Sequence, residues 1–365
     1  MNPCTVSEVV DSDYAWQSLD LPAREDAFSF YDAQWLQAWS QAFLPDRGWE
    51  RPLTIYSVAS GGSQLGFLAL ARQKVSRLRV SALAGYYWPF RTLAVRNDDS
   101  ARKAFAAAIA GHFSRRPPAA VLRFGPVSTA DAALGELLSA LVERGWKALR
   151  CESGGVFELK LPEEPAGLQT QMSGSLLKNI NYLQRRMTKQ CGDVSFERQV
   201  LGSEASDLLN VLSDIETASW VAKEGGEAKF MGRANRAYWT ALGQAEGRCS
   251  DVIVWILRCG GAPIAFSAHI ETKDTVYIIA NSYDEQWKSY SPGSILAFEL
   301  FADACRRGKR RVDWGQGDSG YKSRWGATCG THLFDIMLFR PGLQGRLLFT
   351  LAQRVLPDWD RPDHV

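Results

Sequence analysis

The sequence predicts a mixed α/β protein built from two similar halves, and three observations support this prediction. Strand-like and helix-like segments alternate along the chain, which is the usual pattern of mixed α/β folds. A hairpin with a Gly-Gly turn occurs twice, at residues 56–67 and at residues 255–266. An unusually apolar helix at residues 294–307 lies between two apolar strands. Each half is therefore expected to be a mixed twisted sheet flanked by helices.

Size and composition narrow the class of protein. The chain has 365 residues, of which 46% are apolar and 22% are charged, so about two domains with sizeable cores are expected. Lys and Arg number 42 against 40 Asp and Glu. A balance this close to neutrality predicts that nucleic acid is not the principal partner, because phosphate binding needs clustered positive charge.

Cysteine spacing and hydropathy indicate where the protein works. The seven cysteines are scattered and never form Cys-x-x-Cys, so no metal cofactor is expected. The N-terminal segment has no apolar core of the kind found in signal peptides. No apolar run approaches the ~20 residues of a membrane-spanning helix. These features predict a cytoplasmic protein.

The two halves share an order of elements as well as a hairpin. Gly-Gly supplies the positive φ angles of a tight turn in both hairpins. Aromatic-rich helical segments precede them, at residues 31–39 and 230–242. Helices at 132–144 and 294–307 follow, and each ends in Gly before a strand. A chance recurrence of a common hairpin is the alternative to a true internal repeat.

A Pro- and Glu-rich break at residues 161–165 sets the predicted domain boundary. We therefore expect an N-terminal domain over 1–165, a C-terminal domain over 166–340 and an amphipathic tail over 341–365. The second domain opens with a helix at 176–190 whose apolar residues follow helical spacing. Its basic residues form another face, which meets either solvent or an anionic ligand: Lys178, Arg185, Arg186 and Lys189.

The entry to the apolar helix is a candidate anion site. The Ser291 hydroxyl is expected to cap the helix, and Pro292 suits its first position because the missing N–H would lack a partner. Gly293 has no side chain that blocks close approach. The N–H groups of Gly293, Ser294 and Ile295 are then expected to point at a phosphate, aided by the helix dipole. A good helix start without a ligand is the alternative.

A Gly-rich loop follows the next strand and carries further candidates. Asp313 ends that strand, and the glycines after it permit a sharp, exposed loop. Asp318, Tyr321 and Lys322 are expected near the strand ends. Lys322 is a candidate for binding a phosphate or a developing oxyanion. A surface turn with solvated charges is the alternative.

Two residues outside this loop are candidate general bases. Glu216 lies at the margin of an apolar helical face, where partial desolvation raises the pKa of a carboxyl. His269 falls on the strand that returns from the second hairpin. Structural hydrogen bonding is the alternative for both, and a lone histidine on a strand is more often a structural residue. The sequence has no Gly-x-Ser-x-Gly elbow, Walker loop or dinucleotide-binding glycine pattern, so hydrolase, NTPase and dehydrogenase functions lack support.

Taken together, these motifs resemble a known family. The matching residues are Glu216-x-x-Ser219-Trp220, Gly261-x-Pro263-Ile264-Ala265, Tyr283-Asp284, Tyr290-Ser291-Pro292-Gly293 and the run from Asp313 to Trp325. The pattern is similar to that of GNAT-fold acyltransferases of the cellulose-biosynthesis (CelD-like) acetyltransferase family. That family is related to the Fem-type aminoacyl transferases of peptidoglycan synthesis. The resemblance is clearest over residues 173–339 and weaker over the N-terminal half.

The resemblance implies tandem GNAT-like domains and an acyl-CoA co-substrate. It implies that the strand at 276–281 separates from the strand at 311–314 and opens a cleft for the thioester. The residues implied in donor binding are Tyr290, Ser291, Gly293, Ser294 and Ile295. Those implied in catalysis are Glu216, His269, Tyr283, Asp313, Tyr321 and Lys322, with Trp220, Asp318 and Trp325 near the substrate. Tyr283 or Tyr321 would protonate the leaving thiolate.

The acceptor remains open at the level of sequence. An amine on a small molecule, a lipid such as a sphingoid base, or an exopolysaccharide sugar fits the resemblance. The tail at 343–355 is amphipathic, and it either packs on the protein or makes peripheral contact with a membrane, the inner membrane being the expected one. A Fem-like transferase that uses aminoacyl-tRNA and a non-catalytic assembly factor of a polysaccharide or lipid pathway are the competing functions.

Overall fold

The fold is that of a computed structural model of the chain. It describes residues 3–10, 30–44, 48–75, 78–220, 228–246, 250–318, 320–356 and 358–359. The chain divides into two compact units, the first formed by Met1–Gly155 with Thr331–Val365 and the second by Val156–Gly330. The predicted boundary at residues 161–165 lies close to this division. The segment predicted as the end of the second domain differs, because residues 331–339 pair with a strand of unit 1.

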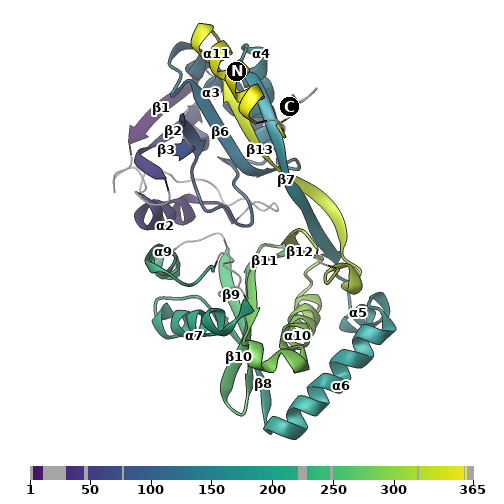
Figure 1. The fold of residues 1–365 in the computed structure, drawn as a ribbon. Coiled ribbons are helices and arrows are strands. Elements are labelled where there is room, and N and C mark those ends of the chain that lie inside the picture. The colour runs from purple at the N-terminus through teal and green to yellow at the C-terminus, as the bar shows by residue number, and fades with distance from the viewer. Residues whose placement is uncertain are drawn as a thin grey trace. The chain divides into compact units, whose positions relative to one another are not determined.

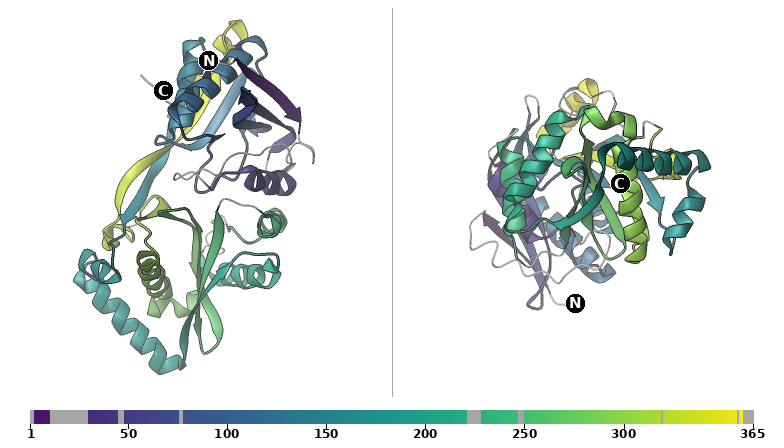
Figure 2. Two further views of the ribbon diagram at one scale, coloured as in Figure 1. Left: turned by 180° about the vertical axis from the view of Figure 1, so that it is seen from behind. Right: turned by 90° about the horizontal axis from the view of Figure 1, so that it is seen from below.

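Unit 1 is a mixed sheet with helices packed on it (Figures 1 and 2). Its strand order is β1-β2-β3-β4-β6-β13-β7, with β5 beside β3. Its elements are β1 (Cys4–Val10), α2 (Ala33–Phe43), β2 (Trp49–Ser60), β3 (Ser63–Val75), β4 (Leu78–Leu83), β5 (Ala94–Val95), α3 (Asp99–Arg115), β6 (Val121–Ser128), α4 (Ala132–Glu143), β7 (Lys147–Lys160), β13 (Thr328–Phe339) and α11 (Leu343–Val355).

Unit 2 is also a mixed sheet, with strand order β7-β12-β11-β10-β9-β8. Figure 1 shows α10 on one face of β9, β10 and β11, and α7 and α9 on the other face. Its elements are α5 (Pro165–Gln171), α6 (Gly174–Cys191), β8 (Val194–Val200), α7 (Ala205–Ala218), α9 (Arg233–Gln244), β9 (Asp251–Cys259), β10 (Ala262–Glu271), β11 (Thr275–Tyr283), η1 (Glu285–Tyr290), α10 (Pro292–Arg306), β12 (Arg311–Gln316) and η2 (Ser323–Trp325).

Both predicted hairpins are present. β2 pairs with β3 across Gly61-Gly62, and β9 pairs with β10 across Gly260-Gly261. All four glycines have positive φ, between 57° and 83°. A residue with a Cβ would be strained in that conformation, which is why the sequence signal is so direct at these turns.

The internal repeat aligns differently from the sequence prediction. α10 connects the parallel strands β11 and β12, and its counterpart in unit 1 is the helix that connects the parallel strands β4 and β6. That helix is α3, not the predicted helix at 132–144, which is α4 and follows β6. The prediction failed because both helices end before a strand, and only strand pairing distinguishes a parallel crossover from the other connection.

Apolar packing follows the predicted helix faces. α10 buries Ile295, Leu296, Leu300 and Phe301 in the core of unit 2, where the apolar face of α6 also packs. A helix that is apolar on most sides must be covered on most sides, and here the sheet and α6 cover it. Among the described residues, no helix is long and apolar enough to cross a membrane, and no group of three or more His, Cys, Asp or Glu could hold a metal ion.

Candidate functional site

The cleft of unit 2 begins where β11 and β12 stop pairing. The two strands are paired only over Thr275–Tyr277 and Arg311–Asp313. Beyond that last rung β11 continues to Tyr283 and β12 continues to Gln316 without further pairing in the register. Parallel strands that separate at their carboxyl ends leave a crevice there, which is a favoured position for ligands. The register therefore agrees with the separation that the sequence predicts.

A pocket of about 560 Å³ occupies this place. Six of the predicted site residues line it: Trp220, Tyr283, Ser291, Gly293, Ser294 and Tyr321. Apolar groups of the sheet, α10 and β12 form much of the remaining wall, among them Phe266, Ile278, Leu296 and Trp314. The size and the mixed lining are those of a small-molecule site.

A β-bulge shapes the strand that borders the pocket. Ala268 of β10 pairs with Ala280, whereas the next residue, His269, pairs with Ile278, so Ile279 is an extra residue in β11. Bulges of this kind bend a strand and re-aim the side chains that follow. The residues after the bulge, Asn281, Ser282 and Tyr283, all line the pocket.

The start of α10 differs in detail from the prediction. Ser291 adopts a left-handed conformation, with φ of 49°, and its side chain makes no capping hydrogen bond, so the predicted hydroxyl cap is wrong. Its carbonyl instead accepts from the N–H groups of Ser294 at 2.9 Å and Ile295 at 3.2 Å. Pro292 has no N–H. Among the described residues, Gly293 alone of the predicted amides keeps an N–H without a partner.

Gly293 also keeps space open beside the pocket. A Cβ at this position would lie 3.6 Å from Cδ1 of Tyr283, at van der Waals contact with the ring. A larger side chain would project into the volume between α10 and Tyr283. The helix N-terminus with its dipole, one open amide and the hydroxyls of Ser291 and Ser294 can receive an anionic group.

Two tyrosines line the pocket, Tyr283 and Tyr321. Burial raises the pKa of Tyr321 to about 12, although a hydrogen bond with the Ser294 side chain acts in the opposite direction. Burial and the nearby Glu285 carboxylate raise the pKa of Tyr283 as well. Both phenols are therefore protonated at neutral pH, and each can donate a proton to a group that gains negative charge. Tyr321 is fixed by an edge-to-face contact with Trp314, with 5.4 Å between ring centroids.

The structure uses Lys322 to hold the loop after β12. Its Nζ donates to the carbonyl of Gly315 at 3.0 Å and to that of Gln316 at 2.9 Å. Burial lowers the pKa of Lys322 to about 8, against the opposing effect of Asp318 and Asp313. Lys322 does not line the pocket. Its geometry is that of a loop clamp rather than of an oxyanion donor.

The two predicted aspartates also face the loop. Asp318 accepts from the backbone N–H groups of Lys322 at 2.8 Å and Ser323 at 3.0 Å, so it closes the turn that presents Tyr321. Asp313 lies at the last paired rung and accepts from the N–H of Gly315 at 2.9 Å. Burial raises the pKa of Asp313 to about 7. Neither carboxylate lines the pocket.

The carboxylate of Glu216 accepts hydrogen bonds from backbone N–H groups. Its side chain is only 2% exposed, and its two oxygens accept from the N–H groups of Lys229 and Phe230, each at 2.9 Å. Burial raises the pKa of Glu216, and hydrogen bonds from these amides and from Met231 oppose that shift. Glu216 does not line the pocket either. It braces the segment that enters α9.

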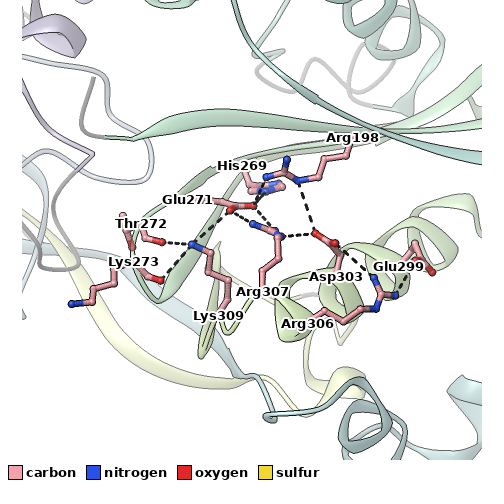
Figure 3. Close-up of polar contacts among 10 residues, drawn as sticks. All are labelled: Arg198, His269, Glu271, Thr272, Lys273, Glu299, Asp303, Arg306, Arg307 and Lys309. Atoms are coloured by element: carbon pink, nitrogen blue, oxygen red, sulfur yellow. Dashed lines mark hydrogen bonds and ion pairs between the residues drawn. The ribbon is translucent and has the colours of Figure 1, made fainter. Parts of the chain in front are cut away.

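His269 belongs to a buried ionic cluster, which Figure 3 shows. Its Nε2 lies 2.8 Å from Oε1 of Glu271, and the same oxygen accepts a hydrogen bond from Arg307. The other oxygen of Glu271, Oε2, lies 3.6 Å from the Lys309 ammonium. Burial lowers the pKa of His269, although Glu271 acts in the opposite direction. Burial alone would raise the pKa of Glu271, but hydrogen bonds from His269 and Arg307 outweigh it and hold that pKa well below its ordinary range. This cluster lies outside the pocket lining.

Three further predicted residues pack inside the unit. Trp325 is fully buried, with its ring 5.5 Å from that of Phe301. The Tyr290 hydroxyl donates to Gln190 of α6, and Arg186 stacks over its ring at 4.9 Å. Ile295 lies in the core. None of these three lines the pocket.

Five polar pocket residues were missed in the sequence: Ser267, Asn281, Ser282, Lys288 and Arg324. A signal existed for two of them, because Asn281 and Ser282 are polar residues at the end of an otherwise apolar strand. Lys288 and Arg324 bring positive charge to the mouth of the pocket. No carboxylate is found among the described residues that line it.

Comparison with known proteins supports the fold. Residues 174–323 match the family model of an acetyltransferase (GNAT) domain. The structure of FemX is similar, with a TM-score of 0.61, 10% identity, and coverage of 95% of this chain and 100% of that one. The C-terminal domain of a protein from Agrobacterium fabrum described as a lysylphosphatidylglycerol synthetase gives a TM-score of 0.50 and 14% identity, covering 88% and 91%. No curated protein sequence matches the chain.

These comparisons confirm the predicted fold class. The matched family model spans the elements that build the pocket, from α6 to the loop after β12, and so covers most of unit 2. The structural similarities extend over both units, which fits two mixed sheets flanked by helices. At these low identities they support the fold and not a substrate.

Proposed function

We propose that the protein is an acyl-CoA-dependent N-acyltransferase that transfers an acyl group from a thioester to an amine. The observation that carries the proposal is the pocket where β11 and β12 separate, closed at one side by the N-terminus of α10. The diphosphate of the donor would bind at Gly293, Ser291 and Ser294. Lys288 and Arg324 add the positive charge that a polyanionic donor requires.

The reaction follows from the groups at hand. The amine nitrogen attacks the thioester carbonyl, so a C–N bond forms and the C–S bond breaks, and the proton lost by the amine is balanced by one gained by the thiolate. Tyr321 or Tyr283 protonates that thiolate, because both phenols carry their proton at neutral pH, and the tyrosinate left behind takes up the proton that the amine nitrogen loses. Backbone N–H groups of β11 after the bulge would stabilise the oxyanion. Holding the amine and the thioester in the right geometry would supply much of the remaining rate enhancement.

No carboxylate lines the described part of the pocket, so none of the described lining residues is an acidic side chain that could take the proton from the amine. Glu216 and His269 are both engaged elsewhere, so we assign neither of them proton transfer from the amine. An acceptor amine that enters uncharged would need no strong base in the pocket. We propose an acceptor from envelope lipid or exopolysaccharide synthesis, such as a sphingoid base or an amino sugar, as in the cellulose-biosynthesis acetyltransferases that the motifs resemble.

Calorimetric titration tests donor binding directly. CoA, acetyl-CoA and palmitoyl-CoA would be titrated into the full chain, into Gly293→Val and into the Lys288→Gln, Arg324→Gln double variant. We expect micromolar binding to the parent chain and at least tenfold weaker binding to both variants. Arg310→Gln, which changes a charge of unit 2 that does not line the pocket, is the matched control. Failure of every CoA species to bind would favour a non-catalytic role.

One observation favours a second function, a Fem-like transferase that uses aminoacyl-tRNA. Helix α6 carries four basic residues and no acidic one, and the Tyr182 ring on it is exposed. A basic helix with an exposed aromatic side chain can contact a phosphate backbone and stack on a base. Filter binding with total tRNA and aminoacyl-tRNA distinguishes the two. Salt-sensitive binding that Arg185→Gln with Lys189→Gln abolishes, without CoA binding, would replace our first proposal.

We further propose that α11 contacts an anionic membrane surface. Gly345, Phe349 and Ala352 form its buried face, yet the opposite face presents Leu343, Leu347 and Leu351, which are 88%, 62% and 46% exposed. Arg346 and Arg354 flank these leucines, and the helix contains no acidic residue. An apolar stripe between arginines matches the depth and charge of a lipid interface. Self-association through this face would bring the same arginines together.

Vesicle sedimentation tests the membrane proposal. The chain should bind vesicles that contain phosphatidylglycerol more tightly than those of phosphatidylcholine alone, and salt should weaken binding. Leu343→Ser with Leu347→Ser should abolish it. Val200→Ser, which alters an exposed apolar residue of unit 2, is the control. Equal binding by the parent and the double serine variant, or a monomer–dimer shift in place of vesicle binding, would contradict the proposal.

A further inference from the structure

Unit 1 contains a second pocket that the proposed function does not use. It has a volume of about 590 Å³ and lies between the edge strand β1 and helix α3. Its apolar wall comes from both elements and from β3, through Val6, Leu65, Ala101 and Ala104. Its polar lining is mainly basic, with Arg96, His112, Arg115 and Arg144 against the carboxylate of Asp98.

Two of these arginines converge on one point. A Cβ added at Gly111 of α3 would lie 3.8 Å from Nη1 of Arg115 and 3.7 Å from Nη2 of Arg144. The two guanidinium groups therefore come close together although they belong to different elements, the last turn of α3 and the end of α4. Within the described part of the chain, neither side chain has a hydrogen bond or an ion pair.

The carboxylates nearby are already engaged. Glu8 lies 2.6 Å from Nε2 of His112. Asp98 pairs with Arg96 at 3.3 Å and caps α3 by accepting from the N–H of Ala101 at 2.8 Å. These contacts leave Arg115 and Arg144 as two like charges without a counter-charge among the described groups. Arginines arranged in this way can bind the oxygens of a phosphate in a bidentate manner.

Helix dipoles do not remove this excess charge. Arg115 lies in the last turn of α3 and Arg144 is the C-cap residue of α4, so the end of each helix contributes a partial negative charge of about one half beside its own arginine. Each guanidinium carries a full positive charge, so the sum of charges at this end of α3 stays positive. The pocket thus pairs a cationic mouth with an apolar wall.

We infer that this pocket binds a phosphate-bearing ligand whose other end is apolar, with Arg115 and Arg144 holding the phosphate. The inference does not rest on the acyltransfer reaction, because its residues lie in unit 1 and donor binding is proposed in unit 2. A lipid headgroup and a soluble alkyl phosphate share this chemistry. The site would give unit 1 a recognition role of its own.

Binding of n-octyl phosphate to the full chain tests the inference by calorimetry. Inorganic phosphate lacks the apolar end and octyl glucoside lacks the charge, so both should bind at least tenfold more weakly. Arg115→Gln and Arg144→Gln should each weaken octyl phosphate binding by about tenfold or more. Arg116→Gln changes the next arginine along the chain, which does not line the pocket, and should bind like the parent.

Additional measurements distinguish a local loss of binding from misfolding, and a lipid ligand from a soluble one. Ala104→Gln should fill the apolar wall and block octyl phosphate while both arginines remain. Unchanged far-UV circular dichroism in the variants would show that loss of binding is local. Vesicles with phosphatidic acid that compete with octyl phosphate would identify a lipid source, and no competition a soluble one. Octyl phosphate binding that survives the Arg115→Gln, Arg144→Gln double variant, or no binding by the parent, would overturn the inference.

Discussion

Glu216 offers a direct test of whether a residue of the predicted catalytic set is a base or a brace. Its carboxylate is buried and accepts from the backbone N–H groups of Lys229 and Phe230 at 2.9 Å. Glu216→Ala would leave these two donors without partners in a dry environment. Glu216→Gln keeps the shape of the side chain but turns one acceptor into a donor that faces an N–H.

The expected magnitudes follow from the number of bonds lost. A buried donor left unsatisfied costs about 1–3 kcal/mol, so Glu216→Ala should lower the free energy of unfolding by about 4 kcal/mol. Glu216→Gln loses one acceptor and should cost about 2 kcal/mol by the same reasoning. Neither change touches the pocket, so CoA binding should persist wherever the variant is folded.

Two measurements on each variant resolve the question. Urea unfolding followed by circular dichroism gives the loss of stability, and hydrogen exchange of the peptide over 228–231 reports whether its amides lose protection. A brace predicts that Ala is worse than Gln in both measurements. A structural role for Glu216 is ruled out if Glu216→Gln is as stable as the parent, keeps its amide protection and binds CoA, yet has no transferase activity.

Three further predictions concern the cleft and its loop. Asp313 has a pKa raised by burial from 3.8 to about 7, so the folded state binds the extra proton and stability should fall as pH rises through that window; Asp313→Asn should flatten this part of the urea-unfolding profile. Lys322→Met removes two hydrogen bonds to the carbonyls of Gly315 and Gln316 and should speed proteolysis of the loop, whereas Lys309→Met, outside the loop, should not. Tyr321→Phe should lower kcat about a hundredfold with little change in KM, and a donor with a better thiol leaving group should recover part of the loss; an unchanged kcat would remove Tyr321 as the proton donor.

Local rules predicted the hairpins and the apolar helix because short segments decide them. Gly61-Gly62 and Gly260-Gly261 reach their positive φ angles without help from distant contacts. The apolar character of α10 likewise predicts burial whatever covers it. The counterpart of α10 in unit 1 was misassigned because the parallel pairing of β4 with β6 joins strands that are far apart in the sequence. Nothing in the helix sequence itself records which strands it connects.

Side-chain roles at the site were harder to predict for a physical reason. Glu216, Lys322 and Asp318 stand in motifs beside the pocket, and their polarity fits catalysis as well as support. In the structure all three side chains bond to backbone groups. The partners of Glu216 are 13 and 14 residues away in the sequence. Those of Lys322 and Asp318 are nearer in the sequence. Buried backbone groups need partners, and charged side chains meet that need strongly. Sequence spacing does not reveal which backbone group a side chain will reach.

α3 and α10 begin differently, so the N-termini of the two helices do not offer an anion the same partners. Both helices connect parallel strands, so their N-termini occupy corresponding places in the two sheets. α3 begins with Asp98, whose carboxylate accepts from the N–H of Ala101, and whose pKa is lowered by its hydrogen bonds with Ser100 and that amide. A fixed negative charge there occupies the Ala101 amide and repels a diphosphate.

α10 begins instead with Ser291-Pro292-Gly293, without a side-chain cap and without a carboxylate at its first turn. Its dipole and the Gly293 amide are therefore left for a ligand. Ser291→Asp should place a carboxylate at this helix start and weaken CoA binding at least tenfold, since charge repulsion is added to the loss of an open amide. Ser291→Asn provides an uncharged side chain of similar size as the control. CoA binding that tolerates the aspartate would mean that the diphosphate lies elsewhere, and the asymmetry between the units would need another cause.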